Sequence, residues 1–184
     1  MPAPHRVATL VGSLRKESLN RRAAHAIAGL APKSLAFDFV EIGDLPLYDE
    51  DRERDAPEAW TRFRGEVGSA DSVLFVTPEY NRSVPGGLKN AIDVGSRPYG
   101  RSVWAGKPAG VVTVSPGAIG GFGANHHLRQ SLVFLDMPVM QQPEAYVGNA
   151  AQLFDADGHV ANEATAKFLR TFANAFAAWV ARFA

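Results

Sequence analysis

The sequence contains no cysteine among its 184 residues. This absence removes disulfide bonds, thiolate metal ligands, redox dithiols and any cysteine nucleophile from consideration. Cysteine-dependent phosphatases, which bind phosphate in a loop that follows a strand, are therefore excluded.

An excess of charge and a long hydrophobic run are missing as well. Nineteen Lys and Arg residues offset nineteen Asp and Glu residues, so no overall field favours nucleic acid or an anionic membrane. No apolar run approaches the ~18 residues of a membrane span, and the N-terminal segment lacks the hydrophobic region of a signal peptide. We expect a cytoplasmic protein that acts on a small molecule, without nucleic-acid or membrane partners.

The remaining composition is that of a globular protein. Hydrophobic residues make up 46% of the chain and charged residues 21%, a balance that argues against disorder. The length suits one domain, and no repeat, low-complexity tract or linker divides the chain. We predict a single domain over residues 1–184.

Short apolar runs alternate with helical patterns along the chain. The patterns predict strands over 6–11, 35–42, 72–76, 109–114 and 138–142, and helices over about 20–30, 57–69, 86–94, 127–135 and 163–183. This alternation indicates an α/β fold with a doubly wound, five-stranded parallel sheet and helices on both faces. In the flavodoxin-like order 2-1-3-4-5, the loops after the first, third and fourth strands meet and line one pocket.

The loop after the first strand, GSLRKESLN at residues 12–20, suits an anion. Its backbone amides and the positive end of the following helix dipole point to the same place. Ser13, Ser18 and Asn20 can donate hydrogen bonds to phosphate oxygens, and Arg15 can add a charged contact. The alternative is that Ser18 or Asn20 only caps the helix and Arg15 is a solvated charge. Because neither GxGxxG nor GK[ST] is present, a nucleoside triphosphatase is not expected.

The loop after the third strand begins the segment TPEYNRSVPGGLKNAID at residues 77–93. A flat heteroaromatic ring needs an apolar wall and polar groups at its edge. Tyr80 can form the wall, and the backbone groups of residues 79–81 can contact the ring edge. The alternative is that Asn81 and Ser83 are turn residues and Tyr80 is a half-buried surface aromatic.

These two segments together resemble the signature loops of the NADPH-dependent FMN reductase family. The resemblance covers most of the chain and continues through SPGAIGG at residues 115–121 and HLRQSLVFLDMPVM at residues 127–140. Within the family, the sequence is most similar to bacterial quinone and chromate reductases.

The resemblance implies a flavodoxin-like fold with tightly bound FMN, its phosphate in the first loop and its ring on the second. The loop after the fourth strand would close the pyrimidine or ribityl side. The implied FMN contacts are Ser13, Arg15, Ser18, Leu19, Asn20, Pro78, Glu79, Tyr80, Asn81, Ser115 and Gly117. No catalytic side chain and no metal are implied, because the flavin N5 atom carries the hydride. The resemblance assigns no role to residues 122–127.

The implied activity is that of an NAD(P)H-dependent oxidoreductase. NADPH or NADH would deliver a hydride to FMN and leave, and a quinone, azo compound, chromate or free flavin would then collect it in a ping-pong cycle. Members of the family are usually homodimers or homotetramers. Phe134, Met137 and Met140 suit either an interface or the core. His126 and His127 point apart on a helix and make a poor metal site.

Two alternatives use the same scaffold. A flavodoxin-type one-electron carrier would bind FMN without its own NAD(P)H activity, but such carriers commonly present a strongly acidic docking face. This chain has zero net charge and no acidic run longer than residues 49–51. A non-catalytic sensor of a phosphate ligand would leave the second loop without a role.

Overall fold

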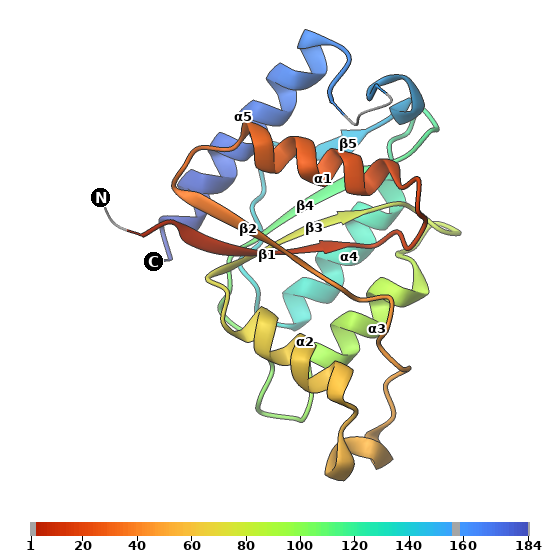
Figure 1. The fold of residues 1–184 in the computed structure, drawn as a ribbon, viewed down its shortest axis with the longest axis vertical. Coiled ribbons are helices and arrows are strands. Elements are labelled where there is room, and N and C mark those ends of the chain that lie inside the picture. The colour runs from red at the N-terminus through yellow and green to blue at the C-terminus, as the bar shows by residue number, and fades with distance from the viewer. Residues whose placement is uncertain (1–2, 156–158, 184) are drawn as a thin grey trace.

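The computed structural model describes residues 3–155 and 159–183 and contains one parallel sheet of five strands. The strands are β1 (His5–Val11), β2 (Leu35–Val40), β3 (Ser72–Thr77), β4 (Ala109–Val114) and β5 (Ala145–Val147). Their order is β2-β1-β3-β4-β5, and each neighbouring pair is parallel (Figure 1). The sheet order predicted from the sequence is confirmed.

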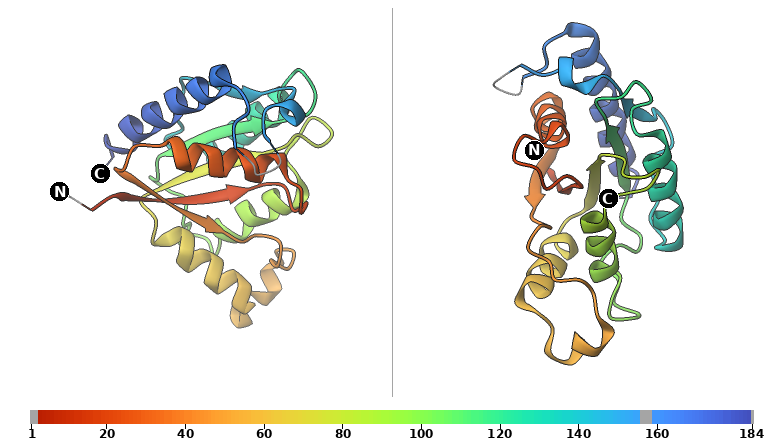
Figure 2. Two further views of the ribbon diagram at one scale, coloured as in Figure 1. Left: turned by 45° about the horizontal axis from the view of Figure 1, so that its top comes forward. Right: turned by 90° about the vertical axis from the view of Figure 1, so that its right-hand side faces the viewer.

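Helices cover both faces of the sheet (Figures 1 and 2). One face carries α1 (Leu19–Leu30) and α5 (Glu163–Val180), and the other carries α2 (Glu58–Gly68), α3 (Gly86–Gly95) and α4 (Phe122–Phe134). Two short 3-10 helices, η1 (Glu50–Asp55) and η2 (Ala150–Gln152), lie in connections. The architecture is therefore doubly wound.

The core forms because the central strands are apolar on both sides. In β3, Leu74 and Val76 pack into the cluster under α1 and α5, whereas Val73 and Phe75 pack into the cluster under the other helices. Strands of a parallel sheet that is covered on both faces have such continuous apolar runs. The sheet is thus held rigidly between two hydrophobic layers, which fixes the positions of the loops at its edge.

The predicted final strand at residues 138–142 was wrong, because the strand lies at Ala145–Val147. Residues 138–140 do touch the start of β4, since Ala109 N donates to Pro138 O and Met140 N to Ala109 O. That contact is a single bridge at Val139. Pro143, which has no N–H to donate, follows it, and regular pairing resumes only beyond this proline.

The remaining element boundaries differ from the predictions by smaller amounts. Helix α4 begins at Phe122, five residues earlier than expected, and α5 ends at Val180. The loop expected over residues 43–55 contains η1. Met137 and Met140 are core residues, whereas Phe134 is exposed.

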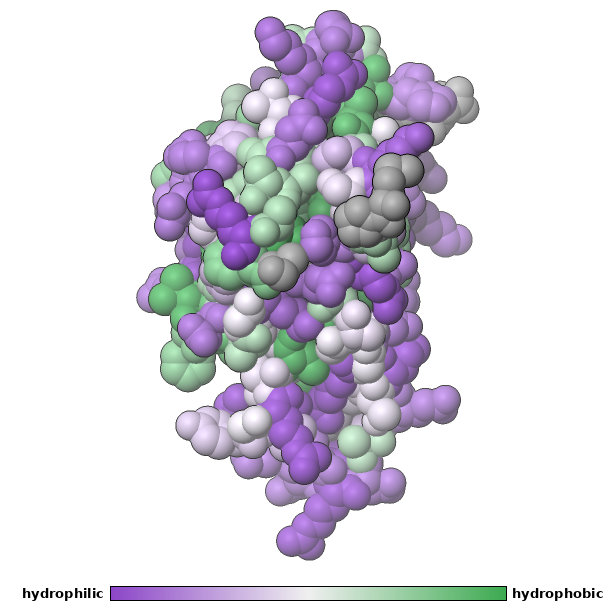
Figure 3. Space-filling model, turned by 90° about the vertical axis from the view of Figure 1, so that its left-hand side faces the viewer, coloured by the Kyte–Doolittle hydropathy of each residue, from purple (hydrophilic) through white to green (hydrophobic). Residues whose placement is uncertain are grey.

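The chain termini lie at one end of the sheet, and the carboxyl ends of the strands lie at the other. Both chain termini lie at the end where the strands begin, and the surface there mixes hydrophilic and hydrophobic residues (Figures 1 and 3). The strands point to the opposite end, which faces the reader in the right-hand view of Figure 2.

Among the described residues, no helix is both long and apolar enough to cross a membrane.

Candidate functional site

A pocket of about 270 Å³ lies where β1, β3 and β4 end, and we call it the switch-point pocket. Three loops meet there: the first loop (residues 12–20), the second loop (residues 77–85) and the third loop (residues 115–121). Nine of the eleven residues predicted from the sequence line this pocket: Ser13, Arg15, Ser18, Leu19, Asn20, Pro78, Glu79, Tyr80 and Ser115. Glu17, Val114 and Pro116 complete the lining.

The first loop presents hydrogen-bond donors at the start of α1. Ser18 is the helix N-cap, and its side chain accepts a hydrogen bond from Arg21 N at 3.2 Å. The Leu19 and Asn20 amides, which come first in the helix, have no acceptor within the described part of the chain. Free amides at a helix N-terminus form an anion site, so Ser18 caps the helix and also lines a pocket suited to phosphate.

One buried polar atom of the first loop has no hydrogen-bond partner among the described residues. Ser13 and Asn20 are both buried, and Asn20 Oδ1 has no hydrogen-bond partner. An unsatisfied buried polar atom is costly. A ligand hydroxyl could donate to this oxygen, and a half-turn of the amide would instead present its NH₂ group to a phosphate. These groups fit the ribityl phosphate arm of FMN.

The charges around the pocket leave one cation without a partner. Glu17 pairs with Arg22 at 2.8 Å, and Glu79 pairs with Arg82 at 2.8 Å. Arg15 forms no ion pair with any described residue. Since both lining carboxylates are neutralised, the pocket favours an anionic ligand.

The first two loops are brought together by a close approach at Gly12. Gly12 N donates to Val76 O at 2.9 Å. A Cβ atom at Gly12 would lie 2.3 Å from Thr77 Oγ1 and 2.8 Å from Thr77 Cβ. Only glycine therefore allows the ends of β1 and β3 to lie this close, and sequence analysis did not identify this requirement.

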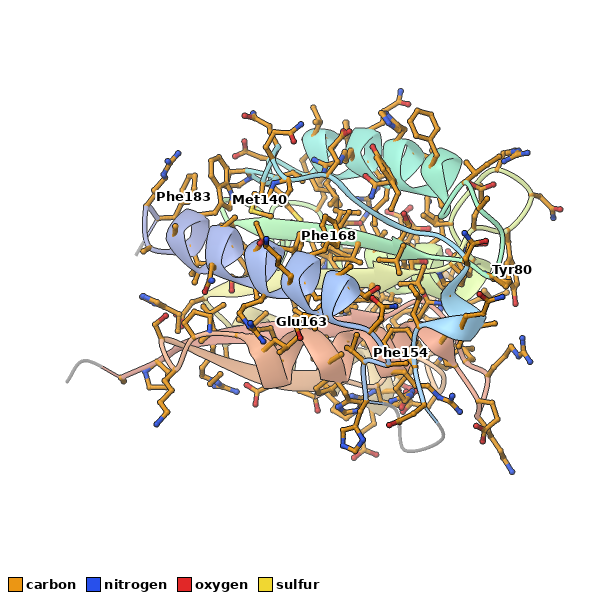
Figure 4. All side chains as sticks on the ribbon, turned by 90° about the horizontal axis from the view of Figure 1, so that it is seen from above. Tyr80, Met140, Phe154, Glu163, Phe168 and Phe183 are labelled. Carbon is orange, nitrogen blue, oxygen red and sulfur yellow. The ribbon has the colours of Figure 1, made fainter. Side chains whose placement is uncertain are left out.

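The second loop folds into a tight hairpin. Tyr80 N donates to Ser83 O at 2.9 Å, and Ser83 N donates to Tyr80 O at 2.8 Å. The Tyr80 side chain is 55% exposed, at the opposite end of the molecule from Phe183 (Figure 4). The Tyr80 N–H therefore donates within the hairpin, and the expected contact of the backbone of residues 79–81 with a ring edge stays a prediction. The aromatic side chain remains available as a wall.

The Glu79 side chain makes two contacts that the sequence did not indicate. Its carboxylate accepts a hydrogen bond from Ala124 N at 3.1 Å, at the start of α4, and its other oxygen pairs with Arg82. The side chain thus joins the second loop to α4 while it lines the pocket. No sequence pattern indicated this contact, because the two residues are 45 positions apart.

Two predicted residues, Asn81 and Gly117, do not line the pocket. Asn81 is at the hairpin tip with φ 49°. Gly117 N donates to Ser115 Oγ at 3.1 Å, which closes a turn in the third loop. Their contacts with FMN stay predictions.

A larger cavity of about 470 Å³ lies away from the strand ends. Its lining comes from α1, from residues 159–160 just before α5 and from the first turn of α5. It includes His25, Leu30, His159 and Val160. Ligands of open parallel sheets bind outside the carboxyl ends of the strands. The smaller switch-point pocket, with its helix N-terminus and free amides, is therefore the better site for a nucleotide-like ligand.

The two adjacent histidines of α4 point apart, as predicted. His126 Nε2 lies 3.1 Å from the Tyr146 hydroxyl, whereas His127 Nδ1 lies 2.7 Å from Ser83 Oγ. In the described residues, no group of three or more His, Asp or Glu side chains could hold a metal ion.

The fold and the site define a class of protein, namely a flavodoxin-like α/β protein with a pocket at the carboxyl ends of its central strands. Residues 5–152 match the model of the NADPH-dependent FMN reductase family, and the chain belongs to that family. It is therefore an oxidoreductase that uses FMN as cofactor and NAD(P)H as electron donor.

Similar proteins agree with this assignment over almost their whole lengths. A quinone reductase of Pseudomonas putida is 67% identical over 181 residues, which cover 98% of this chain and 97% of the relative. A 2-hydroxy-1,4-benzoquinone reductase of Burkholderia sp is 50% identical, with coverage of 95% and 96%. The solved structure of the flavoenzyme NAD(P)H:(acceptor) oxidoreductase FerB from Paracoccus denitrificans superposes with a TM-score of 0.92, at 46% identity and with coverage of 97% and 98%.

Proposed function

We propose that this protein reduces quinones with electrons from NADPH or NADH, by hydride transfer through bound FMN in a ping-pong cycle. The observation that carries the proposal is the meeting of the three loops in the switch-point pocket. Two of the relatives are named for quinone reduction, which favours a quinone as acceptor. Azo compounds, chromate and free flavins are further acceptors that an open ring face would accept.

The proposed FMN contacts divide the pocket into two parts. Ser13, Ser18 and the Leu19 and Asn20 amides would hold the phosphate, and the exposed Arg15 would add a charged contact. Pro78, Glu79 and Tyr80 would hold the ring, and Ser115 would close the third side. When bound, FMN supplies an N5 atom that accepts and donates hydride. The residues of this chain would bind and orient the cofactor and leave one ring face open, and the proton that completes the hydroquinone would come from solvent water.

The proposed molecule is one cytoplasmic domain over residues 1–184 that forms a homodimer or homotetramer. Support for self-association comes from the end of α4, where Val133 and Phe134 are 73% and 86% exposed. Phe134 also lines a hollow of about 300 Å³, together with the apolar Ile92 and Leu135 and the polar or charged Lys89, Asp93, Ser96, Arg97 and Ser131. Exposed apolar surface next to a hollow is typical of a protein interface.

An anaerobic titration of the purified protein tests the proposal. The protein, supplied with FMN if colourless, should show a flavin band that NADPH or NADH bleaches and that a quinone then restores. A bound flavin that ignores both nucleotides would indicate a one-electron carrier instead. Failure to bind FMN at all would refute the assignment of the pocket.

A further inference from the structure

The second loop is held against α4 by contacts at both ends of its hairpin. Before the turn, Glu79 Oε2 accepts from Ala124 N at 3.1 Å, and after the turn, Ser83 Oγ forms a hydrogen bond of 2.7 Å with His127 Nδ1. The packing between them is close, because a Cβ atom at Gly123 would lie 2.9 Å from Glu79 Oε2 and 3.2 Å from Arg82 O. The start of α4 is therefore the support on which the loop rests.

The hairpin benefits from this support because one of its two turn residues is unfavourably placed. Arg82 has a φ of 64°, a left-handed conformation that costs energy for a residue with a long side chain, whereas Asn81, at φ 49°, is a residue type that tolerates it. The two backbone hydrogen bonds between Tyr80 and Ser83 close the turn. A contact that fixes Ser83 consequently fixes the position of Tyr80, which lines the pocket.

We propose that His127 is a positioning residue for the flavin site. Its imidazole fixes Ser83 and, through the hairpin, places Tyr80 and Glu79 where the ring would bind. His127 does not itself line the switch-point pocket, so its effect on FMN is transmitted through Ser83. This inference rests on the proposed function, since it assumes that the ring binds beside the second loop.

His126 provides a matched control on the same helix. Both histidines are exposed, but successive helical residues are rotated by about 100°. His126 accordingly contacts Tyr146 of β5 and packs against Phe122 with the rings tilted by 42° and their centroids 4.2 Å apart. If an imidazole at this end of α4 only provided polar surface, replacing either histidine would have the same effect.

The test compares His127→Ala, His127→Asn, Ser83→Ala and His126→Ala, each as the full chain. The dissociation constant of FMN is measured by fluorescence titration, the visible spectrum of the bound flavin is recorded, and thermal unfolding of the apoprotein is followed. Loss of one hydrogen bond should raise the FMN dissociation constant of His127→Ala about 3- to 10-fold. The spectrum should move toward that of free FMN, and His126→Ala should behave as wild type.

Two further comparisons separate positioning from general stability. His127→Asn keeps a polar atom near the place of Nδ1 and should recover most of the affinity. Ser83→Ala should raise the FMN dissociation constant as much as His127→Ala does. The double variant with both changes should raise it little further, because both changes remove the same contact. Since Ser83→Ala is a small change, it keeps the test valid if His127→Ala does not fold.

The inference is overturned if His127→Ala and Ser83→Ala bind FMN as tightly as His126→Ala with the same spectrum. A lower unfolding temperature of the apoprotein without a change in FMN binding would also overturn it, since that is a purely structural role. The wild-type titration identifies the other kind of failure. If wild type takes up no FMN, the proposed function itself is wrong, whereas normal wild-type binding with unchanged variants rejects only the role of His127.

Discussion

Among the residues that line the pocket, Arg15 is the charged one that can be replaced without breaking an ion pair, so its contribution to FMN binding can be measured directly. It has no ion-pair partner among the described residues, and it is an exposed residue of the pocket lining. We expect Arg15→Ala to weaken FMN binding by roughly 10- to 100-fold, because a charged hydrogen bond contributes about 1.5–3 kcal/mol. Lys16→Ala is the matched control, since Lys16 is an adjacent exposed cation outside the lining. Equal FMN dissociation constants for the two variants would refute the phosphate contact.

Gly12 tests the close approach of the first and second loops. Thr77 is buried at the end of β3, so it cannot easily move away from a new Cβ atom, which would lie 2.8 Å from Thr77 Cβ. We expect Gly12→Ala to lower the free energy of unfolding by about 1–3 kcal/mol, as overpacking does. Urea denaturation of the apoprotein measures this change.

The control for this prediction is another glycine. Gly29 lies in α1 with nothing within 4 Å of its Cβ position. Gly29→Ala should stabilise the protein by about 0.5–1 kcal/mol, because alanine favours a helix. Unchanged stability of Gly12→Ala would show that the strand ends can separate without cost.

Between elements, we expect the contact of β5 with α4 to weaken at alkaline pH, because it includes Tyr146. Burial, together with a hydrogen bond to Glu144, raises the pKa of Tyr146 to about 12. An unfolded tyrosine titrates near ~10, so the folded state holds the proton more tightly and stability decreases as pH rises from about 10 to 12. Tyr146→Phe removes this titration and should make the decline in unfolding free energy shallower over that range.

Urea unfolding at several pH values between about 9 and 12 checks this expectation. Tyr99→Phe is the control, because Tyr99 is 93% exposed and lies outside the contact between β5 and α4. An identical pH slope for wild type and Tyr146→Phe would mean that Tyr146 does not contribute to alkaline unfolding.

An element could be predicted from the sequence where a continuous pattern of apolar residues marks it. β3 and β4 are buried along their whole length, so their apolar runs were clear in the sequence. β5 has only three residues and follows a proline, which leaves no run to detect. Likewise, α4 begins directly after Gly120 and Gly121, which both have positive φ, so its first turn was assigned to a loop.

The same distinction applies to the candidate site. The loops at the strand ends could be identified because chain order and sheet order together place them at one edge. The contacts of Glu79 with Ala124 and of Ser83 with His127 could not, because they join residues 45 and 44 positions apart without any local pattern. Sequence therefore predicted which residues line the pocket better than it predicted what holds them in place.

At the scale of the whole molecule, α4 connects the pocket to the surface. Its first turns support the second loop through Ala124 and His127. Its last turn carries the exposed side chains of Val133 and Phe134. A subunit that covered the last turn would restrain the same helix that contacts the second loop, so the proposed assembly and the proposed FMN site would share a structural element.

Phe134 is the residue at which the proposed assembly can be tested. Stable interfaces bury at least about 1,000 Å² and have an apolar centre, and a carboxylate placed there is costly to bury. We expect wild type to sediment as a dimer or tetramer at micromolar concentration and Phe134→Asp to dissociate at least about tenfold more readily, since ~1.4 kcal/mol gives that factor. Phe183→Asp, at the end of the chain beyond α5, is the control. A wild-type monomer would refute self-association, and an unchanged mass for Phe134→Asp would exclude this end of α4 as the interface.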